Sequence, residues 1–286
     1  MSSTTFGVLQ KKKENIVALF FILPSLTGVL LFYVIPFIMS FNYATSDRGG
    51  NFVWFDNFTS LFGSEAFRLA TWNTLRFMLI AIPLNIAIPV AIACLMFNLK
   101  GINWLKAIFM SPLVIPTAST AFFFQSLFTS NGLLSRLLNT NTNWLETDHA
   151  FAIVVGLYIW KNLGFNLVLA LAARANIPKD YYEWSAVEGM GKMRMFFKIT
   201  LLYLVPGLFI MFVMSFINSF RVFRELYMLA GSHPHHSIYM LQHYMNNQFF
   251  WLNYQNLTTS AFVITLAVSI FMVIFFVLDK KLEFGE

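Results

Sequence analysis

The chain has 286 residues, of which 58% are hydrophobic and only 11% are charged, with a formal net charge of +6. A soluble domain carries about 25% charged residues, so this composition excludes an ordinary water-soluble enzyme and is typical of a protein that lies in lipid. The single cysteine, Cys94, lies in an apolar run, which excludes an internal disulfide and favours a small buried residue over a nucleophile.

Six segments are long and apolar enough to cross the hydrocarbon region as helices, which takes about 20 residues. They are predicted at 16–41, 73–97, 105–128, 151–172, 200–220 and 260–278. Several contain proline, which frees backbone carbonyls and favours a packed bundle around a water-filled path. The first apolar run is too long for a cleaved signal peptide, and no small-residue cleavage site follows it. The sequence therefore predicts an all-α membrane protein with six transmembrane helices.

Lys and Arg are distributed unequally between the two sets of loops. The N-terminus, residues 98–106, residues 173–198 and the C-terminus hold twelve of the nineteen, and basic loops are normally cytoplasmic. We therefore expect cytoplasmic tails at 1–15 and 279–286, a membrane domain over 16–278 and one long cytoplasmic loop at 173–198. The basic excess indicates topology rather than binding to nucleic acid.

The long cytoplasmic loop is predicted to contain a short helix. Pro178 suits the first turn of this helix, where its missing N–H has no intrahelical partner. Gly189 and Gly191 can adopt the positive φ that ends a helix. Apolar surface is expected at Tyr181, Tyr182, Trp184 and Val187. Such a helix can dock onto a soluble partner or rest on lipid headgroups through its aromatic side chains, and the residues leave both readings open.

The sequence of this loop resembles a motif of a known protein family. Glu183, five residues, Gly189, nine residues and then Ile199-Thr-Leu resemble the EAA loop of ABC importer permeases, whose usual form is E-A-A-x-x-x-G, nine residues, I-x-L-P. Trp184 and Ser185 replace the two alanines, and Leu202 replaces the proline. In that family the loop forms a coupling helix that is seated in a cleft of the ATPase. The resemblance therefore implies an ATPase-coupling role for Tyr182, Glu183, Trp184, Ser185, Ala186 and Gly189.

Five further stretches resemble the maltose-type carbohydrate permeases in order and spacing, over nearly the whole chain. They are Phe55-Asp-Asn-Phe, Asn73-Thr-Leu, Pro112-Leu-Val-Ile-Pro, Trp160-Lys-Asn-Leu-Gly-Phe and Gly231-Ser-His-Pro, where the family usually has Gly-Gly-Pro. The resemblance implies the type I ABC importer permease fold in a bacterial cytoplasmic membrane. It also implies four kinds of partner: a second homologous permease, a cytoplasmic ATPase dimer, an extracytoplasmic solute-binding protein and the carbohydrate.

The chain itself is not expected to bind ATP. A phosphate-binding loop needs G-x-x-x-x-G-K-[ST], whereas Gly191-Lys is followed by Met193 and no glycine lies five residues before Gly191. ATP and magnesium are therefore expected in the partner ATPase, and this subunit is expected to be no enzyme and to hold no cofactor or metal.

Lys161 lies near the middle of the fourth predicted span, where a lysine costs about 2.5–3.5 kcal/mol. No Asp or Glu lies inside any predicted span, so its counter-charge is expected from cavity water, another subunit or the substrate. This favours an acidic, uronate-containing oligosaccharide as one hypothesis. The alternatives are an ion pair with the second permease, or a side chain that extends to the membrane surface.

The resemblance also implies which positions line the sugar path. They are Leu113, Thr117, Lys161, Asn162, Phe165, Ser215, Ser219 and Val222, with Asn218 adjacent. The alternative for each residue is a contact that packs one helix against another.

The sequence bears on two other classes of membrane protein and on one possible metal site. An ion-gradient-driven carrier or channel is disfavoured because no acidic group is predicted at depth for ion coupling, and a membrane enzyme lacks clustered catalytic groups. His233, His235 and His236 could form a metal site, but contact with a binding protein or the second permease is favoured. Transport with and without a chelator separates these alternatives.

Overall fold

The computed structural model describes residues 19–96 and 103–283, with side chains from Leu19 to Met96 and from Trp104 to Val277. The expected N-terminal tail lies outside these residues. Every regular element in the described part is helical, and the one β-bridge joins Ser46 to Phe52. The elements are η1 (Leu30–Val34), α2 (Ile35–Ala44), α3 (Asp56–Gly63), α4 (Glu65–Met96), α5 (Asn103–Val114), α6 (Thr117–Phe128), α7 (Leu133–Leu137), η2 (Trp144–Glu146), α8 (Ala150–Ala175), α9 (Lys179–Val187), α10 (Lys192–Met195), η3 (Phe196–Thr200), α11 (Leu201–Arg221), α12 (Phe223–Ala230), η4 (His236–Ile238), α13 (Leu241–Phe250) and α14 (Tyr254–Glu283).

Five helices in the described part are long and apolar enough to cross a membrane, and a sixth span is counted if one bent pair forms a single crossing. The five are Leu19–Ala44, Glu65–Met96, Ala150–Ala175, Lys192–Ala230 and Tyr254–Val277. These agree with five of the predicted spans to within several residues, apart from the fifth, which extends further at both ends. The all-α membrane fold is thus confirmed, whereas the side of the membrane on which the termini lie stays a prediction.

The third predicted span is not one continuous helix. It is divided into α5 and α6, whose pair bends by 98° at the break. Pro116 precedes α6 with an extended ψ of 147°. Proline lacks an N–H and disfavours the helical conformation of the residue before it, here Ile115. Ile115, Pro116 and Thr117 at this break line a cavity, which is the candidate site.

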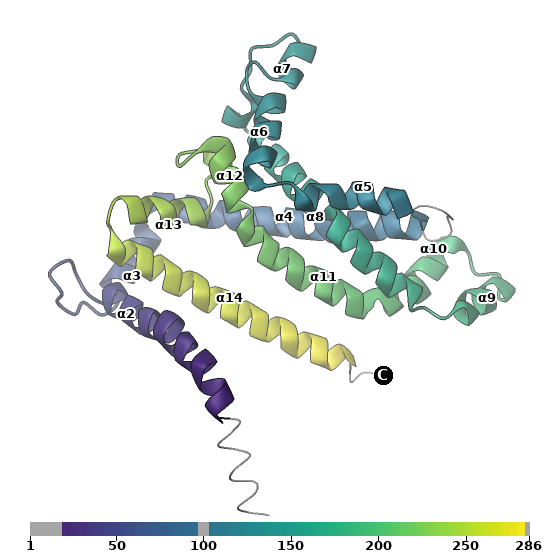
Figure 1. Cartoon of the computed structure of the whole chain (residues 1–286), viewed down its shortest axis with the longest axis horizontal. Coiled ribbons are helices and arrows are strands. Elements are labelled where there is room, and N and C mark those ends of the chain that lie inside the picture. Colours follow the sequence, from purple (N-terminus) through teal and green to yellow (C-terminus); the bar gives the residue numbers. More distant parts are fainter. Residues whose placement is uncertain (1–18, 97–102, 284–286) are drawn as a thin grey trace, which may run out of the picture. The chain divides into compact units, whose positions relative to one another are not determined.

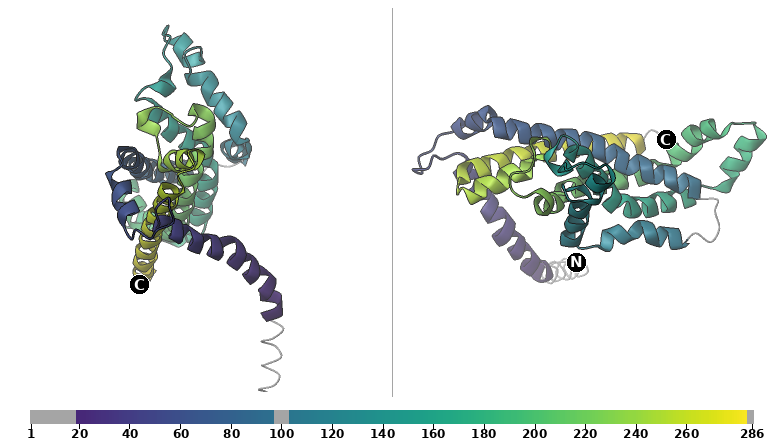
Figure 2. Two further views of the ribbon diagram at one scale, coloured as in Figure 1. Left: turned by 90° about the vertical axis from the view of Figure 1, so that its left-hand side faces the viewer. Right: turned by 90° about the horizontal axis from the view of Figure 1, so that it is seen from above.

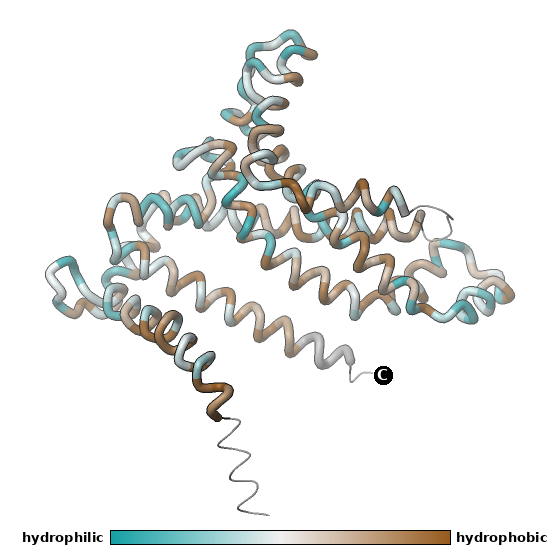
Figure 3. Tube along the Cα trace, in the orientation of Figure 1, coloured by the Kyte–Doolittle hydropathy of each residue, from teal (hydrophilic) through white to brown (hydrophobic). Residues whose placement is uncertain are grey.

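The described residues form two compact units. The larger contains Ser64–Asn247, and the smaller contains the described residues up to Gly63 together with Gln248–Phe276. In the larger unit α8 packs against α4, α5 and α11 (Figure 1), and α9 lies beyond the end of α8 in Figures 1 and 2. Hydrophobic residues follow one another along α11, whereas α9 is mostly hydrophilic (Figure 3).

The core of the larger unit explains several of the family-like stretches. A Cβ added to Gly164 would lie 2.2 Å from the carbonyl oxygen of Phe109, so only glycine permits α5 and α8 to approach this closely. Asn73 donates to the carbonyls of His236 and Tyr239 at 2.6 and 2.9 Å and fixes the turn around η4 to α4. These residues therefore have structural roles that require no ligand.

The smaller unit is held by similar contacts. Asn57, in the Phe55-Asp-Asn-Phe stretch, donates to the carbonyls of Ala44 and Ser46 at 3.0 and 2.9 Å, which satisfies the end of α2. Phe37 stacks on Phe262 with ring centroids 4.7 Å apart. None of the most apolar 18-residue window of Leu19–Ala44 is buried inside the chain, as expected for a helix that faces lipid or a partner subunit.

Candidate functional site

A cavity of about 280 Å³ lies in the larger unit beside the break between α5 and α6. Three parts of the chain line it: the break itself, one side of α8, and the junction of α11 with α12. The lining residues are Leu113, Ile115, Pro116 and Thr117; Leu157, Tyr158, Lys161 and Asn162; and Asn218, Arg221, Val222, Arg224 and Glu225. A cavity with this many polar and charged groups inside a membrane-type bundle requires water or a polar ligand.

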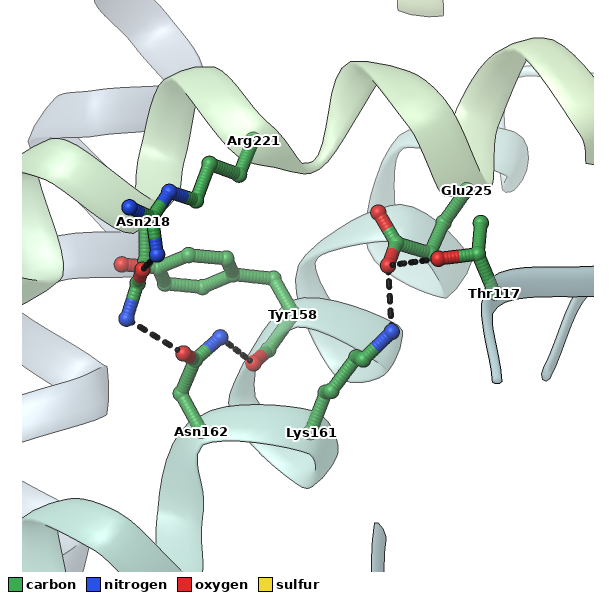
Figure 4. A network of polar contacts seen from close by, with 7 residues as sticks. All are labelled: Thr117, Tyr158, Lys161, Asn162, Asn218, Arg221 and Glu225. Carbon is green, nitrogen blue, oxygen red and sulfur yellow. Dashed lines mark hydrogen bonds and ion pairs between the residues drawn. The ribbon is translucent and has the colours of Figure 1, made fainter. Parts of the chain in front are cut away.

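Lys161 forms an ion pair with Glu225, and Thr117 also donates to the same carboxylate oxygen, at 3.2 Å (Figure 4). The Glu225 residue is only 5% exposed. The expectation that Lys161 finds no counter-charge in its own chain is therefore wrong. The reason is that the helix continues almost without interruption beyond Phe220, where the predicted span ended. As a result, α12 packs against α6 and carries Glu225 into the bundle.

A second set of polar contacts joins α8 to α11. The side-chain amide of Asn218 donates to Asn162 Oδ1 at 2.9 Å, and Asn162 donates to the carbonyl of Tyr158 at 2.8 Å (Figure 4). Arg221 donates to Asn218 Oδ1 at 3.4 Å. This chain of hydrogen bonds orients the Asn218 amide and places Arg221 beside it.

Six of the nine sugar-lining positions from the resemblance line this cavity: Leu113, Thr117, Lys161, Asn162, Asn218 and Val222. The other three, Phe165, Ser215 and Ser219, are absent from its wall. Ser215 accepts from Asn85 at 2.9 Å and from Asn166 at 3.1 Å, and its backbone carbonyl accepts from the Tyr158 hydroxyl at 2.6 Å. Ser219 donates to the carbonyl of Phe216 on its own helix. Direct contact with a sugar stays a prediction for all nine.

The sequence reasoning did not include Tyr158, Arg221, Arg224 and Glu225 among the site residues. The predicted fifth span ends at residue 220, before the last three of these, because the apolar run ends there. Their spacing contained the relevant information: Asn218, Arg221, Val222 and Glu225 recur at the intervals of one helix face. This pattern extends the helix past the apolar run and places its charges on the side that faces α8.

The predicted cytoplasmic helix is present as α9, and it has two distinct faces. Trp184 and Val187 are 76% and 89% exposed, whereas Ser185 is buried. The Tyr182 hydroxyl bonds Thr200 Oγ1 at 3.0 Å, and the guanidinium of Arg174 lies 5.5 Å from the Tyr182 ring. Tyr182 therefore attaches α9 to the bundle and is half-buried, so it adds less to the exposed apolar surface than Trp184 and Val187; its ATPase-coupling role stays a prediction.

The two glycines after α9 differ. Gly189 has φ of +68°, as expected for the residue that ends a helix. Gly191 has φ of −65° and instead precedes α10, so the prediction of a positive φ there is wrong.

Three residues at another loop form a cluster with ligand-type atoms, called here the His–Asp cluster: Asp148, His235 and His236. Their candidate atoms lie within 4.8 Å of one another, and His236 Nε2 is 3.5 Å from Asp148 Oδ1. The side chains of His236 and Asp148 are 66% and 86% exposed. His233 is not part of the cluster. The expectation of no metal stays a prediction.

The fold and the cavity define a membrane transport protein, and comparisons with known proteins identify its family. Residues 85–285 match the family described as "Binding-protein-dependent transport system inner membrane component", and the chain belongs to that family. It is thus a multi-pass permease subunit of an ABC-type importer and not an enzyme; a separate subunit hydrolyses ATP, and the importer also includes a solute-binding protein.

Two relatives and one solved structure illustrate the similarity. The arabinooligosaccharides transport system permease protein AraP of Bacillus subtilis is 31% identical over 73% of this chain and 70% of its own length. The trehalose/maltose transport system permease protein MalF of Thermococcus litoralis is 30% identical over 78% of this chain and 80% of its own. A bacterial ABC transporter "involved in the import of the acidic polysaccharide alginate" contains a chain of the same fold, with a TM-score of 0.80 and 21% identity over 96% of this chain and 98% of that one.

Proposed function

We propose that this subunit carries an oligosaccharide across the cytoplasmic membrane through the cavity between α8, α11–α12 and the break before α6. A solute-binding protein delivers the sugar, and a second permease completes the path. The observation that carries the proposal is this polar cavity in the membrane-embedded unit, with hydroxyl, amide and guanidinium groups from three elements. The carbohydrate names of the relatives support the class of substrate.

Alternating access is the mechanism that fits these parts. ATP binding closes the ATPase pair, α9 moves with it, and the cavity changes the side of the membrane on which it opens. The exposed Trp184 and Val187 supply apolar surface for the ATPase, while the Tyr182–Thr200 hydrogen bond connects α9 to the start of α11. The basic loops support a cytoplasmic location for α9 and for both ends of the chain.

The sequence disfavours an ion-gradient-driven carrier because it predicts no acidic group within a membrane span. Glu225 removes that reason, since it is buried beside the cavity. The family still disfavours such a carrier, because its description is that of a binding-protein-dependent transport system.

The test is uptake by proteoliposomes that contain both permeases, the ATPase and the binding protein. We expect labelled oligosaccharide to enter only with ATP, and Trp184→Ala to reduce uptake and sugar-stimulated ATP hydrolysis at least tenfold. Trp72→Ala is the matched control, because Trp72 is a similarly exposed tryptophan on α4 (62%). Tyr182→Phe removes one hydrogen bond, worth about 1 kcal/mol, and is expected to uncouple hydrolysis from uptake in part. Uptake at the full rate with an ion gradient and no ATP would sink the proposal.

A further inference from the structure

The charges around the cavity are not balanced. Lys161, Arg221, Arg224 and Glu225 line it, so three cations face one anion. The charges of Lys161 and Glu225 neutralise each other. The Glu225 carboxylate also accepts from Thr117 and is nearly inaccessible to a ligand. The excess positive charge therefore lies on Arg221 and Arg224.

Neither arginine has an acidic partner among the described residues, and both side chains are exposed in the isolated chain. Arg221 donates to Asn218 Oδ1 at 3.4 Å, a contact that orients the guanidinium while leaving most of its donors available (Figure 4). A guanidinium forms paired hydrogen bonds with a carboxylate, sulfonate or phosphate. Because a charge in or near the hydrocarbon is costly, two arginines without an acidic partner favour an anion over a neutral ligand in the water-accessible cavity.

We infer that the cavity selects an anionic glycan, and that Arg221 and Arg224 rather than Lys161 supply the positive charge that the glycan meets. This inference rests on the proposed function. Lys161 does not supply this charge, because its ammonium group is paired with Glu225. The competing occupant is an acidic side chain of the second permease, which would neutralise the same two arginines.

Direct binding separates these cases without relying on transport. The assembled importer, in nanodiscs and without its binding protein, is mixed with tetragalacturonate or tetramannuronate, and with the carboxyl-reduced, neutral form of each. Saturation-transfer NMR then gives the affinity of each glycan. We expect at least one acidic glycan to bind about tenfold or more tightly than its neutral form, as one charged hydrogen-bonded contact supplies. That preference is expected to decline between 50 and 500 mM salt.

The variants assign the effect to residues. Arg221→Gln and Arg224→Gln are each expected to reduce the charged-to-neutral affinity ratio at least threefold, and the double variant to abolish it. Arg136→Gln, an exposed arginine on α7 outside the cavity, is expected to leave the ratio unchanged. Equal binding of the two members of every pair, or binding of neither, overturns the inference. So does a ratio that Arg221→Gln leaves intact while it weakens assembly with the second permease. If instead the ratio behaves as expected but uptake proves independent of ATP, the proposed function fails and the charge selection stands.

Discussion

Replacing Glu225 by glutamine tests the ion pair that the sequence did not predict. The substitution keeps the shape of the side chain and its contact with Thr117 but removes the charge that balances Lys161. Removing one member of a buried pair costs about 3–5 kcal/mol, because the other charge remains uncompensated. The Lys161 side chain is 17% exposed, so water can relax part of this penalty. We therefore expect a loss near the lower limit, about 3 kcal/mol.

A double-mutant cycle separates the cost of leaving one charge unpaired from the interaction energy of the ion pair itself. Lys161→Met leaves the Glu225 carboxylate buried, and we expect a comparable loss of about 3–5 kcal/mol. The variant that carries both Lys161→Met and Glu225→Gln has no charge left to bury, and is expected within about 1 kcal/mol of the unchanged chain. Thr117→Val is the control for a lost hydrogen bond alone, worth about 1 kcal/mol.

The assay is reversible unfolding of the purified subunit in mixed micelles by titration with a denaturing detergent, followed by tryptophan fluorescence or circular dichroism. A loss of 3 kcal/mol changes the ratio of folded to unfolded protein by about 150-fold. The reasoning is refuted if each single substitution changes the free energy of unfolding by less than about 1 kcal/mol, or if the two effects simply add in the double variant.

Three further predictions concern packing, pH and metal. Gly164→Ala brings a methyl group against the backbone of α5 and is expected to destabilise the chain by about 1–3 kcal/mol or more. The control is Gly156→Ala, where nothing lies within 4 Å, and it is expected to stabilise by up to about 1 kcal/mol because alanine favours a helix interior. Unfolding in mixed micelles measures both. Burial, and then the charge of His233, lower the pKa of His243 to about 4. In the unfolded chain this side chain binds its proton near pH 6.5, whereas in the folded chain it stays neutral down to about pH 4. The free energy of unfolding is therefore highest above pH 6.5 and falls by about 3 kcal/mol as the pH is lowered toward 4. The prediction is contradicted if His243→Gln leaves this pH dependence unchanged. A zinc-selective chelator, added with magnesium in excess for the partner ATPase, is expected to change ATP-driven uptake less than twofold, because the His236 and Asp148 side chains of the His–Asp cluster are 66% and 86% exposed and water screens their contact. A large loss that zinc restores refutes this expectation.

Apolar run length was sufficient to predict five spans and their order, because burial in lipid is a property of composition over about 20 residues. The length of apolar runs gave the wrong helix boundaries at two places. It joined α5 to α6 across Pro116, since hydropathy does not register that Ile115 and Pro116 leave the helical conformation. It also ended the fifth span at Phe220, since Arg221, Arg224 and Glu225 are polar although they remain helical.

The family resemblance placed six of nine candidate residues at the cavity because it transfers positions along helices, and helix register is preserved when α8 and α11 pack together. It could not distinguish which polar groups are already occupied. Ser215 illustrates this, since its position agrees with the family while its hydroxyl is held by Asn85 and Asn166. Occupancy depends on partners from other helices, and no pattern within one helix contains that information.

The polar groups that share one cavity wall differ in how many of their hydrogen bonds are already formed within the chain. The Glu225 carboxylate and the Lys161 ammonium neutralise each other. Asn218 donates to Asn162, and Asn162 donates to the carbonyl of Tyr158, so a ligand that displaced these contacts would have to replace them. Arg221 donates one hydrogen bond to Asn218, and its other N–H donors are available to a ligand at the junction of α11 and α12. That junction lies on the same cavity as the break before α6, so a ligand held by Arg221 contacts the two irregular points of the bundle. Binding there can favour one arrangement of α6 and α12 over another, which is the differential affinity that an alternating cavity requires.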